Sequence, residues 1–421
     1  MIASRARIAR LMPTVTAVAL LLGCARERAR GQDALLTGPE HRPTDIGVAD
    51  ERDLEVPGGL FTRLGGPVQP GPVPAGLSGM RPSDCEPCHA DIVNEWRSSL
   101  HARSWRDPLF QLEYRVERHA SCPACHAPLA PAGGEPTGSA AEDGISCAVC
   151  HVRDGQVLGR GDGPSARPGT RSRAPADHPI ATRPSMATSA FCAPCHQFRF
   201  PETPDTVGDP GAMAYAPELW LQDTYREWRR SRAADAGKQC QDCHMPRVDT
   251  GDGPGHRSHR FGGMRDPALL ARAVHVQVDA YRLGGDVVVQ VHLRGADIGH
   301  ALPTGDMFRQ LVFDVWGAGH RERGAQATFT RSFAPERRQR ASGDVYYVQG
   351  QRADSRVPAP SSGRPVGIAR TLRLRDIDAD EVQWQLVLHA RAPGSVLLRG
   401  VPEADARAMV RSGRILLAAD R

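Results

Sequence analysis

The residues of this chain best suited to chemistry are five copies of Cys-x-x-Cys-His. This spacing is the attachment signature of c-type haem, because each thiol can add to a haem vinyl group while the adjacent histidine reaches the iron. We therefore predict five covalently bound haem c groups, with the motif histidines as proximal iron ligands. The motifs are Cys85-Glu-Pro-Cys88-His89, Cys122-Pro-Ala-Cys125-His126, Cys147-Ala-Val-Cys150-His151, Cys192-Ala-Pro-Cys195-His196 and Cys240-Gln-Asp-Cys243-His244.

Two other chemistries use paired cysteines. Zinc sites combine two such clusters and do not need a histidine directly after every second cysteine. A redox dithiol occurs once, inside a βαβ pattern that this sequence does not indicate. Ten of the eleven cysteines belong to the motifs, so no thiols remain for a disulfide framework. Haem attachment accounts for the pattern best.

The eleventh cysteine, Cys24, ends an export signal. Three arginines precede an apolar run from Leu11 to Leu22, which is long enough for a secretory signal and too short to span a bilayer. Leu21-Leu22-Gly23-Cys24 resembles the bacterial lipobox, which implies removal of residues 1–23 and lipidation of Cys24. Ordinary soluble secretion is the alternative. We expect an extracytoplasmic, lipid-anchored protein in the periplasm or at the outer membrane surface, and Ala25 favours the outer membrane.

The charge of the chain needs correction before it is interpreted. The formal net charge of +5 includes the three signal arginines, so the mature polypeptide stands at 5 − 3 = +2. Five haems would add about ten propionate charges and bring the total to about −8. The basic composition therefore does not indicate nucleic-acid binding. We expect redox partner proteins and a membrane, and no nucleic acid.

Composition divides the rest of the chain into three parts. Residues 24–80 are rich in proline and glycine and read as a tether, since such a segment buries little apolar surface. Residues 81–263 hold every motif, and we predict short helices and long loops around haems that fill the interior. Residues 266–421 alternate apolar and polar residues around turns such as Gly284-Gly285-Asp286, which predicts a hairpin and a C-terminal all-β sandwich.

Histidines outside the motifs bear on function, because an iron with a second protein ligand is restricted to electron transfer. A helix from His89 to His101 would place these two residues about 18 Å apart, so His101 should serve a neighbouring haem. The candidate distal ligands are His101, His119, His178, His256, His259 and His300.

Several segments resemble a known family. They are similar to multihaem cytochromes related to the tetrahaem cytochrome c that partners hydroxylamine oxidoreductase. The resemblance spans roughly Cys85 to the C-terminus and implies stacked haem pairs, largely bis-histidine ligation and respiratory electron transfer. The segments are Glu95-Trp96-Arg97-Ser98-Ser99-Leu100-His101, Asp143-Gly144-Ile145-Ser146, Cys240-Gln-Asp-Cys-His-Met-Pro246, His256-Arg257-Ser258-His259-Arg260-Phe261 and Gly299-His300-Ala301-Leu302-Pro303-Thr304-Gly305.

One departure concerns an internal repeat. Glu227-Trp228-Arg229-Arg230-Ser231 repeats the segment that begins at Glu95, but Ala233 stands where the first copy has His101. The second copy thus keeps its predicted helix and loses a candidate ligand.

These observations favour an electron carrier that performs no bond chemistry. The alternative is a multihaem oxidoreductase acting on a small nitrogen or sulfur compound at one five-coordinate haem. No cluster of acids and bases lies beside a motif, so the sequence predicts no catalytic residues.

Overall fold

The computed structural model describes the haem-motif region and the C-terminal β region. The described residues are 68, 70–116, 118–119, 121–131, 134–159, 178–200, 215–216, 218–249, 255–361 and 367–418. The predicted signal, Cys24 and most of the predicted tether lie outside these ranges. Within them, no helix combines the length and the apolar composition that crossing a membrane requires.

The haem-motif region consists of short helices. Four of the motifs form helices of four or five residues, and the first motif lies inside the longer helix α2. Proline at the first or second position starts several of them, where its missing N–H costs nothing. The helices are α2 (Pro82–Arg97), α3 (Pro108–Val116), α4 (Cys122–His126), α5 (Gly138–Asp143), α6 (Cys147–His151), α7 (Ala193–His196), α8 (Thr224–Arg229), α9 (Arg232–Asp235) and α10 (Cys240–His244).

Helix α2 differs from the continuous helix expected after the first motif. His89 has φ −125° and ψ 39°, so the helix kinks there, and it ends at Arg97. His101 lies in the turn that follows.

Short strands join these helices. β2 pairs with β1 and β3, and the other strands form two small antiparallel pairs, β4 with β5 and β6 with β7. The strands are β1 (Val152–Arg153), β2 (Gln156–Gly159), β3 (Ile180–Thr182), β4 (Phe198–Arg199), β5 (Trp220–Gln222), β6 (Arg247–Val248) and β7 (His256–Arg257). The end of the expected tether packs on this region, because Gly155 donates its backbone N–H to the carbonyl of Pro70 at 2.9 Å.

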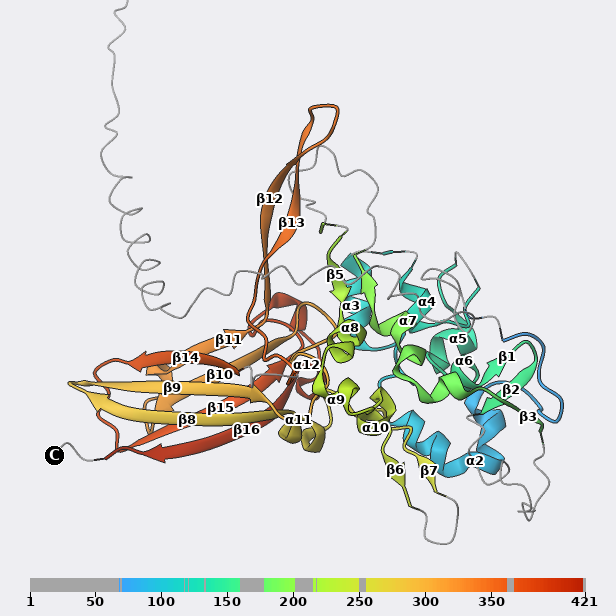
Figure 1. Ribbon diagram of the computed structural model, residues 1–421, viewed down its shortest axis with the longest axis horizontal. Coiled ribbons are helices and arrows are strands. Elements are labelled where there is room, and N and C mark those ends of the chain that lie inside the picture. Colours follow the sequence, from blue (N-terminus) through green and yellow to red (C-terminus); the bar gives the residue numbers. More distant parts are fainter. Residues whose placement is uncertain are drawn as a thin grey trace, which may run out of the picture. The chain divides into compact units, whose positions relative to one another are not determined.

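The C-terminal region is built from two main sheets (Figure 1). One has the order β14-β9-β8 and the other β11-β10-β15-β16. The elements are α11 (Pro267–Ala273), β8 (Val274–Leu283), β9 (Asp286–Gly295), β10 (Gln310–Gly317), β11 (Ala325–Phe329), β12 (Arg331–Gln339), β13 (Val345–Asp354), β14 (Gly367–Leu374), β15 (Glu381–His389), α12 (Glu403–Ala406) and β16 (Arg407–Leu416). The hairpin predicted at Gly284 is confirmed: this residue has φ +61°, which suits glycine, and Leu283 pairs with Asp286.

The two main sheets contribute to one apolar core. Val289 and Val291 of β9 and Phe313 of β10 are fully buried in it. The haem-motif region has only a small cluster of its own, formed by Trp105, Tyr114, Ala127 and Ala130 among the described residues. This contrast agrees with haems forming much of the interior of the motif region.

Strands β12 and β13 form a separate two-stranded ribbon that extends away from the main sheets (Figure 1). Its base contacts the motif region, because Phe333 packs edge-on against Tyr215 with ring centroids 5.2 Å apart. An ionic cluster also joins the two regions: Asp405 of α12 accepts hydrogen bonds or ion pairs from Arg103 at 2.8 Å and Arg265 at 2.9 Å.

Candidate haem attachment and axial-ligand site

The motif cysteines come together in space although the motifs are far apart in the sequence. All ten are free of disulfide bonds. Cys85 lies next to Cys147, Cys125 next to Cys195, and Cys192 next to Cys240. The first motif therefore adjoins the third, and the fourth adjoins both the second and the fifth.

Four motif histidines each face a second imidazole. The distances between ring centroids are 6.3 Å for His89 and His178, 6.4 Å for His196 and His101, 6.2 Å for His151 and His259, and 6.0 Å for His244 and His300. Four of the six candidate distal histidines are thus placed opposite a motif histidine.

This spacing fits an iron held between the two rings. A metal–imidazole bond is roughly 2 Å long and the nitrogen lies about 1 Å from the ring centre, so two ligands across one iron require about 6 Å. Direct stacking of two imidazoles would bring the rings closer. The pairs therefore fit bis-histidine haem.

Backbone carbonyls orient several of these rings. Nδ1 lies 3.0 Å from the carbonyl oxygen of Ser104 in His126 and 3.0 Å from that of Leu158 in His151. The same contact occurs in His244, His259 and His300. A proton on Nδ1 that is donated to a carbonyl leaves Nε2 free to bind a metal.

Burial also favours the neutral form of four histidines at the motifs. It lowers the pKa of His101 to about 3 and the pKa of His126, His196 and His259 to about 4. Only neutral imidazole can ligate iron, so the rings are available as ligands at neutral pH.

The second motif differs from the other four. Phe110 of α3 stacks on His126 with ring centroids 3.6 Å apart and 12° between the planes. In the part of the chain that the structure describes, no second imidazole lies opposite His126.

The two remaining candidates have other partners. Nδ1 of His119 lies 2.7 Å from the hydroxyl of Ser121, and Nε2 of His256 lies 3.2 Å from the carboxylate of Glu95. Neither is placed across from a motif histidine.

Two glutamates that sequence reasoning missed hold the segments bearing distal histidines. Glu95 accepts a hydrogen bond from the backbone N–H of His259 at 2.8 Å. Glu227, at the equivalent position of the repeat, accepts from the backbone N–H of Ala301 and from the hydroxyl of Thr304, both at 3.0 Å. The repeated Glu-Trp-Arg sequence is the feature from which the shared role of these two glutamates could have been predicted.

The geometry also explains the alanine in the second repeat. A Cβ added to Gly299 would lie 3.3 Å from the Cβ of Ala233 and 2.9 Å from Trp228. Ala233 therefore leaves room for the backbone that carries His300. The histidine opposite His244 thus comes from the β region and not from the repeat.

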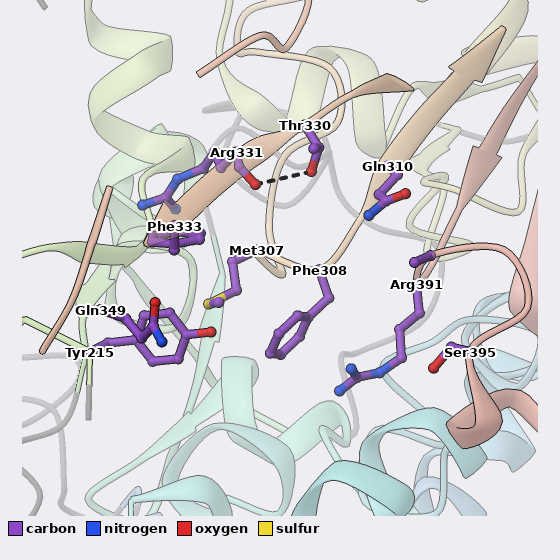
Figure 2. Close-up of a pocket in the computed structure, with 11 residues that line it drawn as sticks. Tyr215, Met307, Phe308, Gln310, Thr330, Arg331, Phe333, Gln349, Arg391 and Ser395 are labelled. Carbon is purple, nitrogen blue, oxygen red and sulfur yellow. Dashed lines mark hydrogen bonds between the residues drawn. The ribbon is translucent and has the colours of Figure 1, made fainter. Parts of the chain in front are cut away.

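A cavity of about 320 Å³ is lined mainly by residues at the base of the β12–β13 ribbon, before β10 and after β15 (Figure 2). Its wall residue Arg391 donates a hydrogen bond from Nε at 2.9 Å to the carboxyl group of Glu113, which lies one turn of α3 after Phe110. Helix α3 thus contacts both a residue of the cavity wall and His126. The lining residues are Tyr215, Met307, Phe308, Gln310, Thr330, Arg331, Phe333, Gln349, Arg391, Ala392 and Ser395.

Two comparisons with known proteins bear on the class of this protein. Residues 84–152, which contain the first three motifs, match the family described as cytochrome c554 and c-prime. The structure is similar to that of a penta-heme cytochrome c552 from Thermochromatium tepidum, with a TM-score of 0.57 and 19% identity over 79% of this chain and 97% of that chain. Comparison with the sequences of characterised proteins finds no match.

The fold and the motifs together support a multihaem c-type cytochrome that binds haem c. At 19% identity the structural likeness shows the fold alone.

Proposed function

We propose that this chain is an exported, lipid-anchored pentahaem c-type cytochrome that carries electrons in a respiratory chain. The observation that carries the proposal is the placement of four motif histidines opposite second imidazoles at 6.0–6.4 Å. An iron with two protein ligands has no position for a substrate, so such a centre exchanges electrons only.

The roles of the residues follow from this geometry. The ten motif cysteines would attach the haems, which would supply one-electron redox couples when bound. The proposed ligand pairs are His89 with His178, His196 with His101, His151 with His259, and His244 with His300. In four of these rings, those of His151, His244, His259 and His300, a backbone carbonyl at Nδ1 would leave Nε2 free to bind an iron.

The contacts between motifs support a branched route for electrons. Cys85 adjoins Cys147 of the third motif, and Cys150 of that motif lies near both cysteines of the fourth. The fourth motif then adjoins the second and the fifth. We infer that electrons move between the first centre and the fourth through the third, and that the route divides at the fourth.

The His126 centre favours a second candidate function. Because no imidazole among the described residues faces this histidine, its iron could accept an external ligand, as an oxidoreductase for a small nitrogen or sulfur compound requires. The carrier function requires only that this centre pass electrons.

The two functions differ in the coordination of the irons. We expect mass spectrometry of the mature holoprotein to show five attached haems, and EPR or resonance Raman spectroscopy to show at least four low-spin irons. Bare thiols or a majority of high-spin irons would overturn the carrier proposal. One centre that binds carbon monoxide and turns over nitrite or hydroxylamine would establish the second candidate.

The β region is interpreted as the expected β-sandwich, since its two main sheets share one core. It is also part of the proposed haem site, because it supplies His300 to the fifth motif. Anchoring through Cys24 would leave the haem region tethered at the membrane.

A further inference from the structure

We propose that the surface around the first motif is the docking site for a redox protein with a basic face. This inference rests on the proposed electron-carrier function and assigns the place where electrons enter or leave. Its first support is exposure: Cys88 is exposed, whereas the other nine motif cysteines are half-buried.

The position of the first motif among the others gives the second support. Cys85 contacts the third motif, whereas the fourth motif contacts the second and the fifth. His101, opposite His196, also lies near the second and fifth motif histidines. The fourth centre therefore lies in the middle of the group and the first lies at an end, where a partner can approach closely.

Exposed apolar side chains flank the first histidine pair. Ile180, which is 50% exposed, follows the proposed ligand His178 by two residues, so their Cα atoms are at most about 7 Å apart. Val73, 46% exposed, follows Pro72, which packs against Gly155 in the turn before β2. Strand β2 is the neighbour of β3, where Ile180 lies. A small apolar centre with a polar rim is typical of protein interfaces, and transient redox interfaces are small.

The charge of the surrounding surface decides the kind of partner. Helix α2, its N-cap residue Arg81 and the residues that pair with Arg81 carry more acidic than basic side chains. Glu95 is not counted, because it contacts the backbone of His259. The acidic residues are Asp84, Glu86, Asp91, Glu142 and Asp143, and the basic ones are Arg81 and Arg97. Counting exposed Arg183 beyond β3 still leaves an excess of 5 − 3 = 2 negative charges. An acidic surface steers a basic partner toward it and accelerates encounter at low salt.

The test measures electron transfer from the reduced holoprotein to a small basic mono-haem cytochrome c by stopped-flow spectroscopy. We expect Asp91→Lys to lower the second-order rate constant about 3- to 10-fold at low ionic strength and to have little effect at high ionic strength. Asp380→Lys is the matched control, because Asp380 is a fully exposed acid at the edge of the β region.

A second pair of variants tests the apolar centre. Ile180→Ser should lower the rate at low and at high ionic strength, because screening does not affect an apolar contact. Leu416→Ser, at an exposed leucine of β16, should leave the rate unchanged.

The outcomes separate the two proposals. If Asp91→Lys and Asp380→Lys change the rate equally, or if no variant near the first motif changes it, the docking site is wrong and the carrier function stands. If the unaltered holoprotein transfers electrons neither to the basic cytochrome nor to a small redox dye, the carrier function fails and the docking site fails with it.

Discussion

The carboxylate of Glu95 accepts a hydrogen bond from the backbone N–H of His259 at 2.8 Å. Glu227 makes the equivalent bond to Ala301, the residue after His300, at 3.0 Å. Two copies of one short sequence thus hold two separate segments, each of which brings a histidine opposite a motif histidine. The repeated segment therefore has two roles. Its glutamates position the segments of His259 and His300, and its first copy also carries the candidate ligand His101.

Glu227→Ala should loosen the segment that carries His300. The substitution leaves the Ala301 N–H and the Thr304 hydroxyl without their acceptor, and losing hydrogen bonds to a charged group should cost about 2 kcal/mol of stability. We expect a high-spin signal from one iron by resonance Raman spectroscopy and a lower melting temperature. Glu142→Gln is the control, because its ion pair with Arg81 is exposed to solvent and contributes little to stability. A wholly low-spin spectrum in Glu227→Ala would contradict the positioning role.

His101→Ala should open the iron position opposite His196, since their rings lie 6.4 Å apart. We expect one additional high-spin centre that binds carbon monoxide, and recovery of the low-spin spectrum when free imidazole is added. His119→Ala should leave the spectrum unchanged, because His119 contacts Ser121 instead. Equal effects of the two substitutions would refute the assigned pairing.

Ala233→His restores the sequence of the first repeat, and the structure predicts that it does harm. A larger side chain at this position meets Gly299, which lies so close that a Cβ added to it would be 3.3 Å from the Cβ of Ala233. Displacing Gly299 should move His300 away from His244, which gives a high-spin iron in EPR spectra. If the variant stayed low-spin and as stable as the parent, the packing argument would be wrong.

Glu113 should make the free energy of unfolding depend on pH between about 4.5 and 8. Burial, followed by the nearby carboxylate of Asp306, raises the pKa of Glu113 to about 8. The folded protein therefore binds a proton that the unfolded chain releases above its ordinary pKa of about 4.5, so this contribution to stability falls as pH rises toward 8. Glu113→Gln should flatten the pH dependence of the free energy of unfolding in this window, and an unchanged slope would exclude the shift.

Cys24→Ser should release the protein from membranes if the lipobox is used. We expect the parent in the membrane fraction with an acylated N-terminal cysteine by mass spectrometry, and the variant in the soluble fraction with its haems still attached. Membrane association of the variant would show that another feature binds the protein there.

Haem attachment could be predicted from the sequence because its signature is local. Cys-x-x-Cys-His needs one turn of helix to present two sulfurs and a nitrogen to a single haem, and helices such as α4 and α10 provide that turn. The hairpin at Gly284 and the change to β structure were predictable for the same reason, since turn residues and period-two alternation are also local.

The distal pairing depends on long-range contacts, which no spacing rule encodes. Six histidines were possible partners by sequence, and the folded chain places four of them opposite motif histidines while His119 and His256 contact Ser121 and Glu95. His300 reaches His244 only because the β region packs against α8 and α9 through Gly299. The sequence by itself determined which atoms can hold haem; the tertiary structure decided which histidines face each other, because that depends on packing between segments far apart in the chain.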